Sequence, residues 1–181
     1  MGGLPVVYNA QQRYNIKNHK MGEQNIMEII LRMADLSDAE KIWKMQTQSF
    51  AEQLWKYQDF DTNPGNEPLE KVIMRLEQAS TYFYLLESDG EVVGAVRVVD
   101  EKKEAVSKRI SPLFVLPAYR RRGIAKQAII EVEKLHGSEG WELATIMEEA
   151  GNCRLYEKMG YRATGEMQVI NDKLTLVYYR K

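Results

Sequence analysis

The sequence predicts one α/β domain of the α+β kind, with about seven strands and four helices in the order β-α-α-β-β-β-α-β-α-β-β. Two features support this prediction. Four segments repeat their apolar residues with the period of a helix, and between them lie short runs rich in β-branched and aromatic residues. The chain has 181 residues, 44 % of them apolar, which is enough for one ordinary buried core.

The first 26 residues are polar and carry no regular pattern, apart from one short apolar run. We interpret residues 1–26 as an N-terminal extension or leader and residues 27–181 as the folded domain, which no repeat or linker divides. The N-terminus lacks the basic and apolar segments of a secretory signal. No apolar run approaches the roughly 18 residues that span a bilayer. We therefore expect a cytoplasmic protein with no membrane partner.

The first strand is expected at residues 27–33, followed directly by the first helix. Ser37 and Glu40 match the S-x-x-E capping box, in which two side chains satisfy free N–H groups at a helix start. A helix that begins at Ser37 has a buried face formed by Ala39, Ile42, Trp43 and Phe50.

A long connection is expected at residues 54–68, with the turn signal Asn63-Pro64-Gly65 at its centre. It mixes aromatic and acidic side chains, namely Trp55, Tyr57, Phe60, Asp59, Asp61 and Glu67. Such a mixture either lines a pocket for a cation, through charge pairing and cation–π contact, or lies on the surface as a loop held down by its aromatic residues.

The remaining elements follow from periodicity and turn signals. Pro68 begins a second helix, whose apolar stripe consists of Leu69, Val72, Ile73 and Leu76. Further strands are expected at 82–87, 92–99, 109–115 and 141–147, further helices from 124 to near 137 and at 152–159, and a final hairpin at 161–170 and 174–179.

Three arginines stand between the strand that Pro117 ends and the helix that begins after Gly123. A helix N-terminus has unpaired N–H groups and a partial positive charge, so it attracts anions, and a glycine lets a phosphate approach the backbone. Arg120, Arg121 and Arg122 add cationic, fork-shaped donors. Because the formal net charge of the chain is −1, this positive charge is local, and it favours a cofactor pyrophosphate over nucleic acid or membrane.

The sequence offers few residues for cysteine or histidine chemistry. Cys153 is the one cysteine, and the two histidines are His19 and His136. We therefore expect no internal disulfide, no Cys/His metal site and no Ser-His-Asp or Cys-His nucleophile.

Two segments resemble signatures of the GNAT N-acetyltransferase superfamily. Arg120-x-x-Gly123-x-Ala125, after a strand that ends Leu113-Phe114-Val115-x-Pro117, resembles its acyl-CoA signature. Further along, Leu155-Tyr156-Glu157-Lys158-Met159-Gly160-Tyr161 resembles its second signature. The resemblance implies a single GNAT-like domain, with a mixed, mostly antiparallel twisted sheet whose middle strands splay apart at the acyl-CoA cleft. It also implies acetyl-CoA as the acyl donor, and no metal.

The resemblance further implies which residues bind coenzyme A. Backbone groups of Phe114 and Val115 would bind the acetyl carbonyl and the pantetheine amides, and N–H groups at the helix start would bind the pyrophosphate. Arg120 is the arginine expected to be functional, whereas the alternative for any of the three is a solvated basic helix start. The implied cofactor-binding residues are Phe114, Val115, Arg120, Arg121, Arg122, Gly123, Ile124, Ala125, Lys126 and Asn152.

Tyr156 is the residue to which the resemblance gives a chemical role, that of a general acid. A positioned phenol can protonate the thiolate of coenzyme A as it leaves. The alternative is a tyrosine that covers the core with its hydroxyl in water. Asn152 lies four residues earlier on the same helical face. The family often carries an amide there or nearby that touches the pantetheine arm, but Glu149 occupies its more usual position and Asn152 is displaced from it.

No general base is assigned. A lysine-like amine has a pKa of about 10.4, so it must lose a proton before it attacks. Residues 109–115 include no carboxylate, so a residue of 54–68 or a chain of waters is as good a choice as the acids elsewhere, which are Glu87, Asp100, Glu101, Glu104 and Glu142. A covalent acetyl-Cys153 is not expected, because no histidine is near it in sequence to form a thiolate. Direct transfer in a ternary complex is expected instead.

These features predict an acetyl-CoA-dependent N-acetyltransferase that acts on a primary amine of a small molecule. The alternatives are a peptide or protein N-acetyltransferase and a CoA-binding module without turnover. The last hairpin, in which Leu174, Leu176 and Tyr178 alternate with other residues, either pairs across a homodimer or completes the sheet of the monomer.

Overall fold

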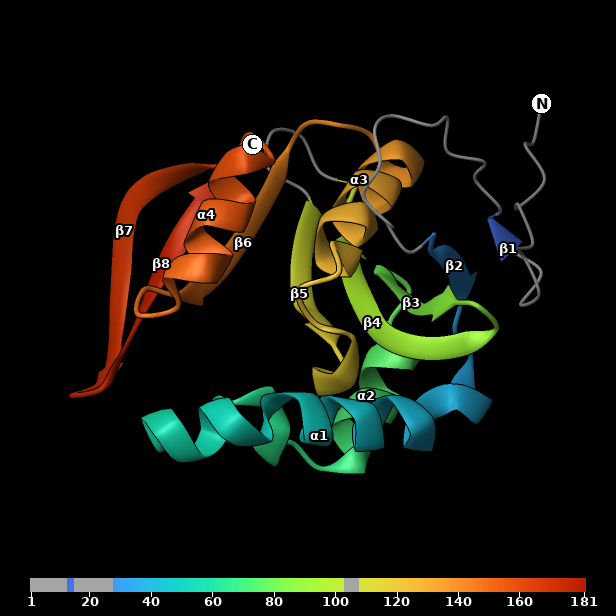
Figure 1. The fold of residues 1–181 in the computed structure, drawn as a ribbon, viewed down its shortest axis with the longest axis horizontal. Helices are drawn as coiled ribbons and strands as arrows, with labels where there is room; N and C mark the ends of the chain where they lie inside the picture. The colour runs from blue at the N-terminus through green and yellow to red at the C-terminus, as the bar shows by residue number, and fades with distance from the viewer. Residues whose placement is uncertain (1–12, 15–27, 103–107) are drawn as a thin grey trace.

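A computed structural model describes residues 13–14, 28–102 and 108–181 (Figure 1). Its strands form one sheet in the order β1-β2-β3-β4-β5-β6-β8-β7, in which every neighbouring pair is antiparallel except β5 with β6. The expected mixed, mostly antiparallel sheet is confirmed. The short strand β1 (Arg13–Tyr14) pairs with β2 and belongs to the segment interpreted as an extension. The rest of residues 1–26 lies outside the described residues.

The order of the later elements agrees with the predicted order, and from β3 onward their bounds lie close to the predicted ones. The helices are α1 (Ala39–Tyr57), α2 (Leu69–Glu77), α3 (Ile124–His136) and α4 (Ala150–Lys158). The strands after β1 are β2 (Ile30–Met33), β3 (Thr81–Ser88), β4 (Glu91–Asp100), β5 (Lys108–Val115), β6 (Trp141–Ile146), β7 (Arg162–Asn171) and β8 (Leu174–Arg180).

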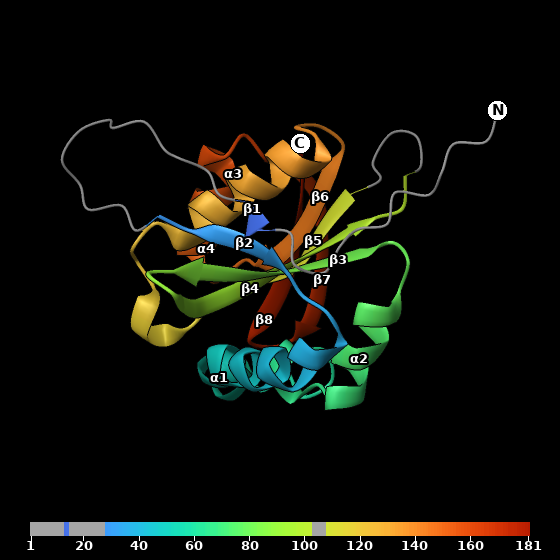
Figure 2. The same cartoon turned by 90° about the vertical axis from the view of Figure 1, so that its right-hand side faces the viewer.

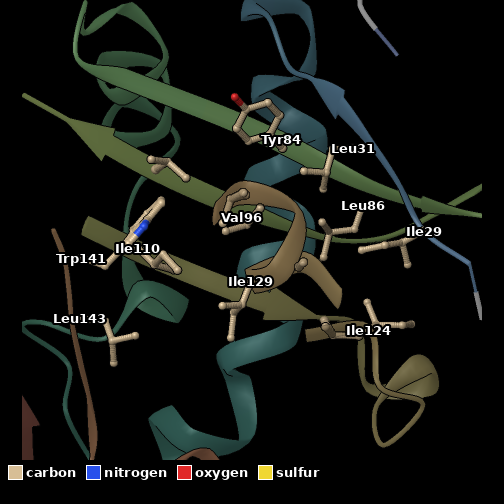
Figure 3. Close-up of a cluster of buried hydrophobic side chains, with 14 of the residues drawn as sticks. Ile29, Leu31, Tyr84, Leu86, Val96, Ile110, Ile124, Ile129, Trp141 and Leu143 are labelled. Carbon is tan, nitrogen blue, oxygen red and sulfur yellow. The ribbon is translucent and has the colours of Figure 1, made fainter. Parts of the chain in front are cut away.

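Two apolar cores lie on opposite faces of the sheet, with α1 and α2 on one face and α3 on the other (Figure 2). Successive side chains of a strand point to opposite faces, so β3 and β4 contribute to both cores. The core beside α3 includes Leu31, Tyr84, Leu86, Val96, Ile110, Ile124, Ile129 and Trp141 (Figure 3). The core beside α1 and α2 includes Ala39, Ile42, Val72, Phe83, Leu85 and Phe114. The predicted apolar faces of the helices therefore pack against the sheet.

The start of α1 differs from the prediction. The capping box of Ser37 and Glu40 is wrong, because Asp35 and Asp38 form the box instead. The Asp35 carboxylate accepts a hydrogen bond from the Ser37 N–H at 2.8 Å, and the Asp38 carboxylate accepts one from the Asp35 N–H at 3.2 Å. Aspartate caps a helix start as well as serine does. A 3-10 turn at Leu36–Asp38 therefore precedes α1, which begins two residues later than predicted.

The sheet opens between β5 and β6. These strands pair only where they begin, at Lys108 with Trp141 and at Arg109 with Glu142. Beyond that point β5 continues to pair with β4, while β6 pairs with β8 on its other side. The two strands therefore separate towards their C-terminal ends, which the ribbon shows as a gap in the middle of the sheet (Figure 1). The expected splayed strands are confirmed.

The last hairpin completes the sheet of its own chain. β8 lies between β6 and β7 and is antiparallel to both. Its position agrees with one of the two roles expected for the hairpin, and a homodimer stays a prediction. Within the described residues, no helix is both long enough and apolar enough to cross a membrane.

Candidate active site

A cavity of about 670 Å³ occupies the opening between β5 and β6. One side of it, which we call the donor wall, consists of residues 113–126 of β5 and the arginine turn together with residues of α4. The other side, the acceptor wall, consists of residues from α1, the loop after α1, and β8. Of the predicted site residues, the cavity is lined by Phe114, Val115, Arg120, Arg121, Gly123, Ile124, Ala125, Lys126, Asn152 and Tyr156.

The backbone of β5 turns the N–H and the carbonyl of Val115 towards the cavity. The Phe114 carbonyl faces β4 so closely that a Cβ at Gly94 would lie 2.3 Å from it. The Val115 N–H belongs to the same peptide group, so it points the other way, towards the opening. Likewise the Leu116 N–H donates to Val93 in β4, which turns the Val115 carbonyl towards the opening. Val115 is thus better oriented than Phe114 to bind a ligand through its backbone.

The arginine turn ends at the N-terminus of α3. Gly123 caps the helix with φ of 79°, a left-handed conformation that suits glycine, and Arg121 adopts φ of 61° just before it. The first N–H to bond within the helix is that of Gln127, which donates to the Gly123 carbonyl at 3.0 Å. The N–H groups of residues 124–126 therefore have no partner within the helix, and these residues line the cavity. A helix start of this kind favours an anion.

The three arginines have different surroundings. Arg120 donates from Nε to the Val115 carbonyl at 3.2 Å and from its terminal nitrogen to the Ser49 carbonyl of α1, so its side chain joins the two walls. Arg121 lines the cavity. Arg122 is the one predicted site residue that does not line it. Its guanidinium lies 5.4 Å from the centre of a neighbouring tyrosine ring, so contact between Arg122 and coenzyme A stays a prediction.

Tyr156 lies on α4 and lines the cavity while its ring packs against the main core. The ring centres of Tyr161 and Tyr179 lie 6.0 and 6.2 Å away. Burial, with a smaller contribution from Cys153, raises the pKa of Tyr156 to about 12. The phenol is protonated at neutral pH, as a tyrosine with the ordinary pKa of about 10 also is. Its ring packs against the core, and its role as general acid stays a prediction.

Glu149 joins the start of α4 to the end of α1. Its carboxylate accepts hydrogen bonds from the Tyr57 hydroxyl at 2.6 Å and from the Lys56 ammonium at 2.8 Å. Burial alone would raise the pKa of Glu149, but the two hydrogen bonds outweigh it and hold the pKa below its ordinary value. Asn152 lines the cavity beside Glu149. No local sequence pattern indicates this contact, because its partners lie more than 90 residues apart.

Where the structure describes them, the acids outside 54–68 that were considered as general bases do not line the cavity. Glu87 pairs with Arg32 at 2.8 Å, Asp100 approaches His136 at 3.5 Å, and Glu142 approaches Arg180 at 3.9 Å. Glu101 does not line the cavity either, and Glu104 lies outside the described residues. Among the described residues, the carboxylates that do line the cavity are Asp59 and Glu149.

Each of the two interpretations of residues 54–68 applies to a different part of the segment. Asp59 lines the cavity, as a pocket-forming loop requires. Trp55 and Phe60 pack edge to face against each other, with 72 % and 47 % of their surface exposed, and neither lines the cavity. One acid of the segment, Asp59, therefore contributes to the cavity, and the aromatic pair lies on the surface. Ser49 and Gln53 of α1 also line the cavity, and the sequence did not indicate them.

The family model of an acetyltransferase (GNAT) domain matches residues 45–181. This match covers most of the chain and includes both signature segments, so the chain belongs to the GNAT acetyltransferase family. The protein is therefore an enzyme that transfers acetyl groups. A search of curated proteins with this sequence found no match.

Solved acetyltransferase structures share the fold at low sequence identity. Spermidine N-acetyltransferase from Vibrio cholerae, in complex with CoA and spermine, has a TM-score of 0.66 and 14 % identity over 83 % of this chain and 93 % of its own. PaiA N-acetyltransferase from Thermoplasma acidophilum, in complex with coenzyme A, has a TM-score of 0.61 and 16 % identity over 86 % and 100 %. RimL, a ribosomal L7/L12 alpha-N-protein acetyltransferase in complex with coenzyme A, has a TM-score of 0.62 and 15 % identity over 83 % and 92 %.

Proposed function

We propose that the protein transfers the acetyl group of acetyl-CoA to the primary amine of a small molecule by direct attack in a ternary complex. The observation that carries this proposal is that one cavity contains both walls. The donor wall offers a free strand edge, a helix N-terminus and a phenol, and the acceptor wall leaves room beside them for a second substrate. The family supports the acetyl transfer, and the acceptor is our inference.

The donor wall has the groups that acetyl-CoA requires. The backbone N–H of Val115 can donate to the acetyl carbonyl or to a pantetheine amide, because it faces the opening. The N–H groups of residues 124–126 can hold the pyrophosphate, and Arg121 and Lys126 add positive charge on the same wall. Asn152 can contact the pantetheine arm with its side-chain amide. We assign Arg120 a place in this site through its side-chain contacts with both walls.

The chemical step balances when the nitrogen loses two protons and the sulfur gains one. The acceptor first loses one proton from its ammonium to solvent, which leaves a neutral amine. The amine nitrogen then forms a bond to the thioester carbonyl carbon and loses its second proton to solvent, and collapse of the resulting tetrahedral species breaks the C–S bond. The sulfur leaves with the electron pair of that bond and takes a proton from the Tyr156 hydroxyl, which regains one of the two released protons through solvent. A protonated phenol at neutral pH suits this role as general acid.

Release of the CoA thiol in the presence of an amine panel tests the proposal. We expect release that depends on a small primary amine and yields one acetylated amine for each thiol. Release only with peptides or proteins would favour a protein acceptor, and acetyl-CoA binding without release under any condition would contradict turnover by this site. Either result would overturn the small-molecule proposal.

A further inference from the structure

The acceptor wall contains two buried polar groups with capacity for a ligand. Asp59 is 6 % exposed, and its carboxylate accepts hydrogen bonds from the Thr62 N–H at 2.9 Å and the Thr62 hydroxyl at 2.6 Å. Ser49 is 3 % exposed, and its hydroxyl has no hydrogen-bond partner in the described part of the chain. Both residues line the cavity. A buried hydroxyl without a partner is rare, and a ligand that bonds to it removes the cost of burying it.

The charges of the cavity wall leave one carboxylate uncompensated. The cationic residues that line it, Arg120, Arg121 and Lys126, belong to the donor wall. Glu149 already accepts from the ammonium of a lysine at 2.8 Å. For Asp59, by contrast, no cationic partner exists among residues 13–14, 28–102 and 108–181. A buried charge without a partner costs free energy, so the acceptor wall favours a ligand with one positive charge.

The rest of the acceptor wall is uncharged. Gln53, Thr62 and Asn63 are polar, and the apolar side chains are Phe50 and Pro64, from α1 and the loop, and Leu174 and Leu176, from β8. The apolar side chains can cover a hydrocarbon body and gain free energy from its burial. None of these residues carries a charge that could pair a second ammonium group, so burying a second charge there costs free energy. The wall therefore suits a ligand with one charged end and an apolar body.

We propose that the acceptor is a primary amine with a single positive charge on an apolar body, and that Asp59, assisted by the Ser49 hydroxyl, selects it. This inference rests on the proposed function and narrows it. A polyamine such as spermidine carries several charges, and this wall has one free carboxylate to meet them. An amine that also carries a carboxylate is disfavoured, because the carboxylate of Asp59 would repel it.

The variant Asp59→Asn removes the charge and keeps the shape. Asparagine can still accept from the Thr62 N–H and can donate to the Thr62 hydroxyl, so the loop keeps its hydrogen bonds. We expect the KM for hexylamine to rise about 10- to 100-fold, as for the loss of a charged hydrogen bond, while acetyl-CoA affinity is unchanged. Asp61→Asn is the matched control, because Asp61 is exposed on the same loop and does not line the cavity. We expect no change in that variant.

A weakly basic amine that is neutral at pH 7, 2,2,2-trifluoroethylamine, separates charge recognition from a structural effect. Its KM should be the same in the wild type and in Asp59→Asn, because it brings no charge for the carboxylate to meet. Ser49→Ala should raise the KM for hexylamine by about fivefold, as for one neutral hydrogen bond. A rise in KM for both amines would mean that Asp59 only supports the loop.

The kinetics with hexylamine and with spermidine distinguish this proposal from its alternatives. In the wild type, kcat/KM for hexylamine should exceed that for spermidine. A preference for spermidine, or equal kinetics in Asp59→Asn and Asp61→Asn, would overturn the inference and leave amine acetylation intact. If no amine releases the CoA thiol, the proposed function fails. Calorimetry of hexylamine binding to the CoA-loaded protein then still tests the site, and binding that Asp59→Asn does not weaken would overturn it.

Discussion

The donor wall and the acceptor wall of the cavity are built in different ways. The donor wall is mostly one segment, residues 113–126, with α4 beside it, and the groups that we propose bind acetyl-CoA are largely backbone N–H groups at a strand edge and a helix start. The acceptor wall gathers side chains from α1, the loop after it, and β8, which are far apart in the sequence. A site formed by backbone groups can keep the same ligand when its side chains are substituted. A site formed by side chains can change its ligand through one substitution.

The largest expected effect lies on the donor side. Tyr156→Phe removes the proton donor and keeps the ring that packs against the core. We expect kcat to fall about 100-fold or more, in the range typical of a lost general acid, while the dissociation constant of acetyl-CoA changes little. Steady-state kinetics and calorimetry measure the two quantities. Unchanged kcat would mean that Tyr156 only covers the core, and the donor wall would then bind its ligand without acting on it.

The second effect tests the strand edge. A Cβ at position 94 would meet the Phe114 carbonyl at 2.3 Å, so Gly94→Ala forces β4 and β5 apart. We expect a loss of about 1–3 kcal/mol of unfolding free energy, as for other overpacked sites, and weaker acetyl-CoA binding. Chemical denaturation measures the first. Gly151→Ala is the control, since a Cβ there meets no atom within 4 Å. Equal stability of both variants would show that β5 adjusts freely.

The third prediction concerns the residue that joins the walls. Arg120→Gln removes the donors to the Val115 and Ser49 carbonyls, so we expect the KM for the amine and for acetyl-CoA each to rise about tenfold. A direct phosphate contact would instead weaken CoA and spare both the amine and a pantetheine analogue that lacks the pyrophosphate. Comparing inhibition by CoA with inhibition by that analogue distinguishes the two roles. Arg122→Gln serves as the control, because Arg122 does not line the cavity.

The smallest effect is a dependence of stability on pH. The pKa of Glu149 is lower in the folded protein than its ordinary value, so its hydrogen bonds with Lys56 and Tyr57 add stability above that ordinary pKa, about 4.3. The contribution is lost as the pH falls through the lowered value. We expect Glu149→Gln to be slightly less stable than the wild type at pH 7 and to match it near pH 3. Thermal unfolding at several pH values measures this, and parallel curves would contradict it.

The difference between the two walls explains which site residues could be predicted from the sequence. Arg120, Gly123 and Tyr156 lie in short segments whose local pattern implies their surroundings, so the sequence led to the donor wall and to the order of the elements. Ser49 and Gln53 lie on an ordinary helix, and only the folded chain brings them to the cavity. The start of α1 was misjudged for a related reason. Two competing capping patterns overlap there, and the choice between Ser37 and Asp35 depends on local geometry rather than on residue type.

Helix α1 also determines how far the sheet opens. It packs against β3 and β5 through Phe83, Leu85 and Phe114 on one side of the gap. At its other end the Asn171 amide donates to the Tyr57 carbonyl at 3.0 Å, and the Tyr57 hydroxyl holds Glu149 across the gap. α1 therefore spans both half-sheets, whose facing strands β5 and β6 pair, within the described residues, at Lys108 with Trp141 and at Arg109 with Glu142 (Figure 1). Lengthening or shortening α1 by one turn, about 5.4 Å, would therefore resize the acceptor space and also shift the contacts of α1 with Arg120 and Glu149.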